Sequence, residues 1–205
     1  GHGQEWSSVS GNITIGSSAT LDGVGLGFPT ATGPGYPGAN GAASYGGRSR
    51  DSVNYYGNAS SPTSLGSGGY SQAGGSGIKL YAVNLVEING IINMSSKNAE
   101  SQYLGAGGSI WLKANNISGS GTIKADGGAG NTEGGGGGRI RLEYSSALEY
   151  TGIISVAGGV GTAAVGWEGK PGTLTFTNNT WPENWNLTGN IGLLGGDFGD
   201  GETIN

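Results

Sequence analysis

The stretch Gly107-Gly108-Ser109-Ile110-Trp111-Leu112-Lys113 decides the fold, because its pattern recurs along the chain. Gly-Ile-Lys-Leu-Tyr at residues 77–81 and Arg-Ile-Arg-Leu-Glu at residues 139–143 repeat it, each after a glycine pair or a Gly-Gly-Ser step. A fourth copy, Thr-Leu-Thr-Phe-Thr at residues 173–177, follows Pro171-Gly172. Apolar and polar residues alternate within each copy, and this period of two predicts β-strands whose successive side chains point to opposite faces.

A second set of apolar segments follows the first at a regular distance. These segments cover residues 90–94, 121–125 and 152–156, and successive copies are 31 residues apart. Between the two sets, Val86, Ile117 and Leu148 mark a third short apolar element. We therefore predict repeats of about 31 residues, each with three short strands joined by turns.

A single repeat of this length cannot bury its apolar side, but stacked copies can. Stacking places equivalent apolar residues in two interior columns, Ile78, Ile110, Ile140 and Leu174 in the first and Ile92, Ile123 and Ile154 in the second. The sequence therefore predicts an all-β chain folded as a β-solenoid, or β-helix, of about four to five coils. Glycine suits the corners of such coils, where backbones approach closely and φ is often positive.

We expect residues 1–205 to form one β-solenoid domain. Its expected parts are an incomplete first coil (12–23), a Tyr- and Gly-rich insertion or cap (24–76), the repeats (77–177) and a C-terminal cap or exchange segment (178–205). The insertion is much longer than the connections between later repeats. A loop of that length in a compact domain indicates either a functional insertion or a wrong assignment of its elements.

Three glycine-rich segments carry a resemblance to known proteins. Residues 107–114, 118–123 and 134–140 resemble the glycine-rich β-helix repeats of large secreted and cell-surface proteins, and the resemblance extends over about residues 66–176. It implies a β-helix fold, a structural or adhesive role and a location at the cell surface. It supplies no catalytic motif.

Composition excludes several classes of function. The chain has 47 glycines, 14 acidic against 9 basic residues, and a net charge of −5, which argues against a nucleic-acid partner. It has no cysteine, and its one histidine is His2, so thiolate chemistry and a Ser-His-Asp triad are not expected. No apolar run approaches the ~20 residues of a spanning helix, so we expect no membrane insertion. We predict that the chain is not an enzyme and has no catalytic residues.

The outward face of the first strand set is the main predicted binding surface. With the isoleucine column inward, Lys79, Trp111 and Arg141 form one outward row, and Tyr81 and Lys113 begin the next. A tryptophan between two cations is a stacking surface for a sugar ring. The same arrangement is also a cation–π ladder that only stabilises the sheet. Both interpretations stay open.

Other aromatic residues are further binding candidates. Tyr55 and Tyr56 lie in the insertion, where tyrosines among Gly, Ser and Asn resemble the composition of adaptable binding loops. The insertion could equally cap the amino-terminal end of the stack. Trp181 and Trp185 lie beyond the last repeat and are predicted to contact the same kind of ligand.

Two kinds of ligand or modification are suggested by short motifs. Asp197, Asp200 and Glu202 lie in a Gly-Asp stretch that suggests calcium as a cofactor, although a solvated acidic tail is the simpler interpretation. Six Asn-x-Ser/Thr sequons suggest glycosylation, at Asn12, Asn58, Asn93, Asn116, Asn178 and Asn186.

Two functions from different classes fit these observations. The first is a non-catalytic extracellular structural or adhesive surface protein that self-associates, as a filament subunit would, by strand addition. The second is a carbohydrate-binding module that holds a surface polysaccharide through exposed aromatic residues. A small polysaccharide-active enzyme is a distant third. The chain offers only accidental carboxylate pairs for hydrolysis, or a lysine or arginine base on the outer face with a single acid, Glu143, beside it.

Overall fold

Eleven β-strands make up the regular structure of this computed structural model, which describes residues 3–8, 11–38, 41–50, 55–100, 103–163 and 167–176. In chain order they are β1 (Gln4–Ser8), β2 (Asn12–Ile15), β3 (Thr20–Asp22), β4 (Gly77–Ala82), β5 (Leu85–Ile88), β6 (Ile91–Asn93), β7 (Ser109–Gly119), β8 (Thr122–Lys124), β9 (Arg139–Tyr150), β10 (Ile153–Ser155) and β11 (Thr173–Phe176). Within the described ranges there is no helix, and so none long and apolar enough to cross a membrane.

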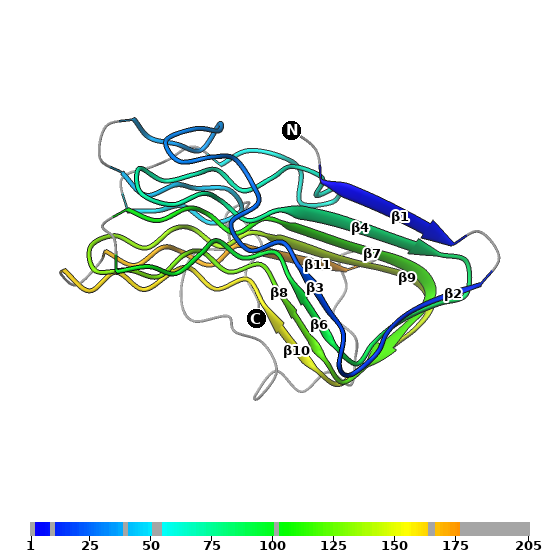
Figure 1. The fold of residues 1–205 in the computed structure, drawn as a ribbon. Helices are drawn as coiled ribbons and strands as arrows, with labels where there is room; N and C mark the ends of the chain where they lie inside the picture. The colour runs from blue at the N-terminus through cyan, green and yellow to red at the C-terminus, as the bar shows by residue number, and fades with distance from the viewer. Residues whose placement is uncertain are drawn as a thin grey trace, which may run out of the picture.

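The strands form two sheets, and within each sheet all paired strands are parallel. The larger sheet has seven strands. β4 lies between β1 and β7, and β9 lies between β7 and β11. The short strand β5 also pairs with β7, and β2 pairs with β5. The smaller sheet has four strands in the order β10-β8-β6-β3. Figure 1 shows the strands of each sheet running side by side, with the two sheets meeting at the bend between β9 and β10.

The registers confirm both predicted apolar columns. Ile78 pairs with Ile110, Ile110 with Ile140, and Ile140 with Leu174 in the larger sheet. In the smaller sheet Ile154 pairs with Ile123, which in turn pairs with Ile92. These side chains belong to one apolar core between the sheets, and all are buried except Leu174, which is partly buried. The alternation of the sequence therefore specifies which face of each strand is buried.

A second part of the molecule consists of glycine-rich segments that leave the strands and return to them. We call residues 23–38, 41–50, 55–76, 94–100, 103–108, 125–138, 156–163 and 167–172 the glycine-rich bundle. In Figure 1 these segments extend away from the strand ends to the left. Residues 134–138 exchange backbone hydrogen bonds with five other segments: 43–47, 105–108, 125–128, 156–159 and 167–172. A strand within a sheet bonds to two neighbours, so the bundle is a different kind of backbone packing.

Glycine is required where these backbones touch. A methyl group placed on Gly136 would overlap the carbonyl oxygen of Gly47, and one on Gly135 would overlap the carbonyl oxygen of Gly105. Neither glycine has a positive φ, so the requirement is for close approach and not for an unusual backbone conformation. The run of five glycines at 134–138 is thus explained by its several backbone neighbours.

The prediction of a β-solenoid was wrong. Two sheets of parallel strands are present, and the chain does not close into a tube of coils, because the return path of each repeat runs through the glycine-rich bundle. The three-strand repeat is confirmed in the first copy, where β4, β5 and β6 are separate strands and Val86 lies in β5. It was wrong for the next two copies: Ile117 and Leu148 lie in the long strands β7 and β9, which also contain Ile110 and Ile140, so each of these repeats has two strands. A closed tube would need a third sheet whose side chains fill its interior, and glycine has no side chain to do so.

The long insertion anchors itself through Tyr45. This side chain is fully buried against Ala43 and Ala106, and Tyr56 packs on the same cluster. The Tyr45 hydroxyl is 2.7 Å from Oγ of Ser109, the first residue of β7. The insertion is therefore tied to the start of the central strand of the larger sheet.

Candidate functional site

The outer face of the larger sheet carries the predicted row of charged and aromatic residues. The register places Lys79 opposite Trp111 and Trp111 opposite Arg141, as predicted, and adds Glu5 of β1 before Lys79. Lys79 Nζ lies 4.4 Å from the centre of the Trp111 ring and 3.2 Å from a carboxylate oxygen of Glu5. The indole is therefore already covered by a cation of its own chain.

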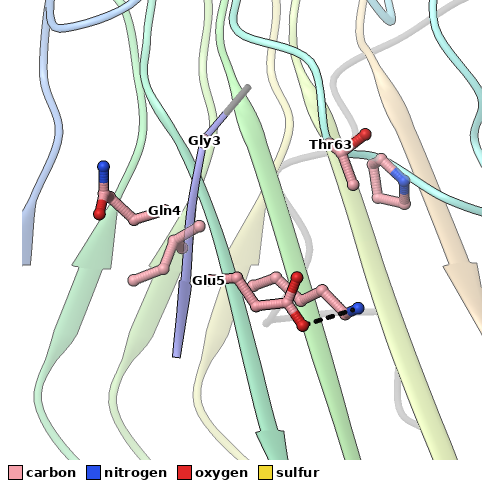
Figure 2. Close-up of a pocket in the computed structure, with 8 residues that line it drawn as sticks. Gly3, Gln4, Glu5 and Thr63 are labelled. Atoms are coloured by element: carbon pink, nitrogen blue, oxygen red, sulfur yellow. Dashed lines mark ion pairs between the residues drawn. The ribbon is translucent and has the colours of Figure 1, made fainter. Parts of the chain in front are cut away.

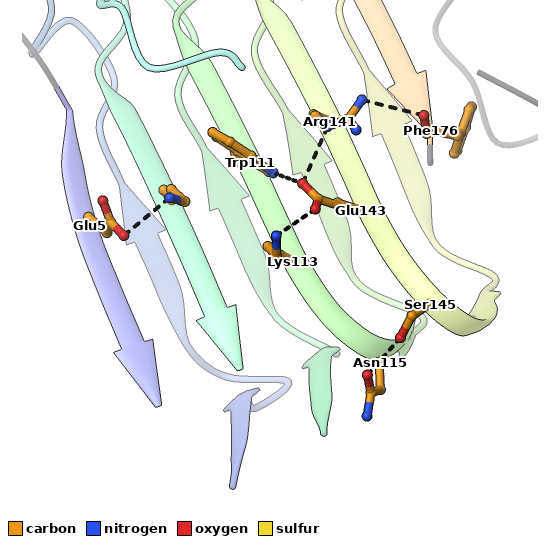
Figure 3. Close-up of polar contacts among 9 residues, drawn as sticks. Glu5, Trp111, Lys113, Asn115, Arg141, Glu143, Ser145 and Phe176 are labelled. Atoms are coloured by element: carbon orange, nitrogen blue, oxygen red, sulfur yellow. Dashed lines mark hydrogen bonds and ion pairs between the residues drawn. The ribbon is translucent and has the colours of Figure 1, made fainter. Parts of the chain in front are cut away.

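Glu143 of β9 is the centre of this network (Figure 3). Its Oε2 accepts a hydrogen bond of 3.1 Å from Nε1 of Trp111 and lies 3.5 Å from Nε of Arg141. Its Oε1 lies 2.6 Å from Nζ of Lys113. Partial burial acts to raise the pKa of Glu143, but the hydrogen bond and charge of Lys113, the indole hydrogen bond and the charge of Arg141 together lower it. The carboxylate is therefore held ionised and positioned by three side chains.

The structure brings most of the predicted binding residues together, but their side chains contact one another and are not left free for a ligand. Lys113 Nζ also lies 5.9 Å from the centre of the Tyr81 ring, so all five predicted outer-face residues contact a neighbour in this network. The geometry favours the cation–π ladder over an open platform for a sugar ring. Glu5 was missed because β1 lacks the Gly-Gly step that precedes the other copies of the pattern.

Tyr56, a predicted binding residue, packs inside the fold. Its ring centroid lies 4.6 Å from that of Tyr45, and its hydroxyl donates to the carbonyl oxygen of Leu65 at 2.5 Å. The Arg139 guanidinium donates to the Tyr56 carbonyl oxygen at 3.0 Å and lies 5.3 Å from the Tyr45 ring centre. Burial raises the pKa of both tyrosines, against smaller opposing effects of hydrogen bonds and of Arg139. Both hydroxyls therefore stay protonated at neutral pH.

A polar groove lies where the smaller sheet meets the glycine-rich bundle, and sequence reasoning missed it. Its volume is about 260 Å³, and all of its lining residues except Val24 come from equivalent positions of three successive repeats. Asn93 and Lys124 are register partners in β6 and β8, while Asn98 and Asp126 follow these strands. One signal was available: side chains here bond to the backbone 31 residues further on, as Asn98 Oδ1 does by accepting the amide hydrogen of Ala129.

Asp126 is the most firmly held polar group in the groove. Its Oδ1 accepts hydrogen bonds from the Ser155 hydroxyl at 2.5 Å and from the Ala157 amide at 2.9 Å. Its Oδ2 lies 3.8 Å from Nζ of Lys124, which is an ion pair but too long for a hydrogen bond. One carboxylate oxygen is thus bound to the fold, and the other is directed to the lysine.

A smaller recess of about 220 Å³ adjoins the edge strand β1 (Figure 2). Gly3, Gln4 and Glu5 line one side and Thr63 of the glycine-rich bundle lies on the other, where its carbonyl oxygen accepts the amide hydrogen of Gly3 at 3.2 Å. Lys79 also lines the recess, and its Nζ lies 3.2 Å from a carboxylate oxygen of Glu5. The recess lies at the edge of the sheet, where β1 pairs with β4 alone among the described strands.

The other predicted site residues are placed as follows. Tyr55 is partly exposed, at 38%. Asn12 and Asn58 are exposed, whereas Asn93 and Asn116 are half-buried within strands β6 and β7. The candidates Trp181, Trp185, Asp197, Asp200, Glu202, Asn178 and Asn186 lie outside the described residues. Within the part of the chain that is described, no three His, Cys, Asp or Glu side chains come together as metal ligands would.

The outer-face network and the groove differ in what they can do chemically. Each charged side chain of the network contacts one of opposite charge, whereas the groove keeps polar groups directed to an open space. Comparison of the chain with protein-family models, with curated proteins and with solved structures finds no significant match.

Proposed function

We propose that this chain is a non-catalytic structural or adhesive protein of the extracellular surface, and that its copies join end to end by strand addition. The observation that supports this most is that two edge strands of the larger sheet, β1 and β11, lie at opposite ends of one series of register partners. Trp6 of β1, Leu80, Leu112, Leu142 and Phe176 of β11 occupy successive positions of one row. A strand β1 from a second copy would continue the row beyond β11.

Trp6 gives this row an unfinished end. Leu80, Leu112 and Leu142 are fully buried and Phe176 nearly so, yet Trp6 on the same face is 48% exposed. Among the described strands β1 pairs only with β4, and β11 pairs only with β9. An edge strand with an exposed aromatic residue is a template for pairing with another chain. Because the two edges differ, such a contact is heterologous, and it forms an open chain of copies where the rotation between copies does not close a ring.

Other features are consistent with a passive role. Each charged side chain of the outer-face network contacts one of opposite charge, and the glycine-rich bundle packs backbone on backbone. Six sequons agree with an extracellular location, and two of them, at Asn12 and Asn58, are on exposed side chains.

Size measurement with a matched variant tests the proposal. Light scattering after size exclusion and negative-stain microscopy should show concentration-dependent oligomers or filaments for the purified chain. Trp6→Glu should reduce them to monomers, because it places a charge in the unfinished apolar row. Tyr70→Glu is the control, since Tyr70 is similarly exposed, at 51%, but belongs to the glycine-rich bundle. A chain that is monomeric at every concentration contradicts the proposal.

Polysaccharide binding through exposed aromatic residues is the alternative. The observation that favours it is the exposure of Tyr55 and Tyr70 on the glycine-rich bundle. Tyr70 meets Tyr103 in an edge-to-face contact with ring centroids 6.2 Å apart, which leaves an aromatic pair at the surface. Loss of binding to soluble polysaccharides in a Tyr55→Ala, Tyr70→Ala double variant would support this alternative.

A further inference from the structure

We infer that the groove of Asn93, Asn98, Lys124 and Asp126 is a binding site for a neutral saccharide, held through a pair of neighbouring hydroxyl groups. The site is independent of strand addition at the sheet edges. It rests on the alternative function, polysaccharide binding, and specifies a binding site that does not depend on exposed aromatic residues. Its volume of about 260 Å³ is slightly below the usual range for drug-sized ligands, about 300–1,000 Å³, and suits a small polar unit.

The polar groups of the groove are fixed by the backbone through one atom each. Asn98 Oδ1 accepts the Ala129 amide hydrogen at 2.9 Å, Asn93 Oδ1 accepts the Ser95 amide hydrogen at 3.2 Å, and Asp126 Oδ1 accepts that of Ala157 at 2.9 Å. In each case the second polar atom of the side chain has no hydrogen bond to any described residue. Two amide nitrogens and one carboxylate oxygen are therefore positioned in advance and unused.

Lys124 and Asp126 complete the chemistry. Their charged atoms are 3.8 Å apart, so neither satisfies the other with a direct hydrogen bond. A hydroxyl group is both donor and acceptor, and one placed between them donates to Asp126 Oδ2 while accepting from Lys124 Nζ. A second, neighbouring hydroxyl then accepts from the amide nitrogen of Asn98.

Charge and shape select the ligand class. One lysine and one aspartate make the groove neutral overall, which favours a neutral sugar over a uronate or a phosphate. Val24 and the 56% exposed Val160 lie among the lining residues and provide apolar surface for the C–H groups of a sugar ring. Because the lining comes from three stacked repeats, a linear chain of sugars can lie along the stacking direction.

Affinity electrophoresis of the full chain tests the inference. Native gels would contain dextran, galactomannan, mixed-linkage β-glucan or, as the anionic comparison, polygalacturonate. We expect at least one neutral polysaccharide to retard the wild type. Asp126→Asn and Lys124→Met should each weaken that retention by about tenfold, the effect of one hydrogen bond to a charged group. Both variants keep the backbone contacts of Asp126 Oδ1, and an unchanged melting temperature verifies the fold.

A matched pair of asparagines supplies the control. Asn89 Oδ1 accepts the Ser120 amide hydrogen, again 31 residues on, but Asn89 does not line the groove. Asn98→Ala should weaken retention, whereas Asn89→Ala should not. The inference is overturned by absence of retention on every neutral polysaccharide, by equal loss in both asparagine variants, or by retention on polygalacturonate alone. It is also overturned if the Tyr55→Ala, Tyr70→Ala double variant loses binding while the groove variants keep it, and the aromatic alternative then stands.

Discussion

The carboxylate of Glu143 accepts the indole hydrogen of Trp111 across two adjacent parallel strands, with Nε1 and Oε2 3.1 Å apart. The same carboxylate holds Lys113 at 2.6 Å, and Lys79 covers the indole from the other side. A tryptophan that sequence alone offers as a sugar platform is thus built into the sheet.

Trp111→Ala should destabilise the fold by about 2 kcal/mol, because the indole loses its contact with Lys79 and its partial burial. Chemical denaturation followed by tryptophan fluorescence and circular dichroism measures the change. Trp6→Ala is the control, since Trp6 is 48% exposed at the sheet edge and should cost clearly less. Equal destabilisation by the two substitutions would show that the network adds nothing to the stability of the sheet.

Glu143 gives the fold a defined acid sensitivity. Its pKa is lowered in the folded chain, so its contribution to stability is present above the unfolded value, about 4.3, and is lost as the pH falls through the folded value. The contribution is about 1 kcal/mol or less, because the group is partly exposed. The melting temperature of Glu143→Gln should therefore fall less below pH ~4.3 than that of the wild type. Glu149→Gln, at an exposed position of the same strand, should follow the wild-type curve.

Gly136→Ala should destabilise the chain by about 3 kcal/mol or more, because the new methyl group overlaps the Gly47 carbonyl oxygen inside the glycine-rich bundle. Gly16→Ala is the matched control: a methyl group there has no atom within 4 Å, and its φ is not positive. Thermal melting of the two variants should separate them clearly. A tolerated Gly136→Ala would mean that the bundle backbones are further apart than described.

The buried tyrosines predict an alkaline limit to stability. Burial raises the pKa of Tyr45, Tyr56 and Tyr150 in the folded chain, so the stability they contribute is present below the unfolded value, about 10, and is lost as the pH rises above it. In an ultraviolet titration these three of the nine tyrosines should ionise only when the chain unfolds. Smooth ionisation of all nine near pH ~10 in the folded protein would contradict this.

The sequence predicted the strands and their registers well and the path between them poorly. Alternation places Ile110 and Ile140 inward and Trp111 and Arg141 outward whatever the wider architecture is, because it depends only on the period of a strand. The glycine-rich segments have no such period. Their neighbours are other backbones, as for Gly136 beside Gly47. Because glycine has no side chain, its position in the sequence does not indicate which segment it packs against.

The candidate sites follow the same division. The outer-face row was predictable because each of its members lies one residue from a predicted core position. The groove was not, because Asn98 and Asp126 lie in loops whose placement depends on the bundle. Only the recurrence of polar residues at a spacing of 31, with Ser95 Oγ accepting the Asp126 amide hydrogen and Asp126 Oδ1 accepting that of Ala157, could have indicated it.

The multiple hydrogen-bond neighbours of residues 134–138 have a mechanical consequence. A strand at the edge of a sheet can be peeled away one bond after another, because a pulling force is concentrated on the last bond. A segment joined to five others on different sides shares the load among all of them, and it must shear many bonds at once to move. In a molecule anchored at one end and held at the other, the glycine-rich bundle would therefore behave as a stiff strut that needs no side chains for its rigidity.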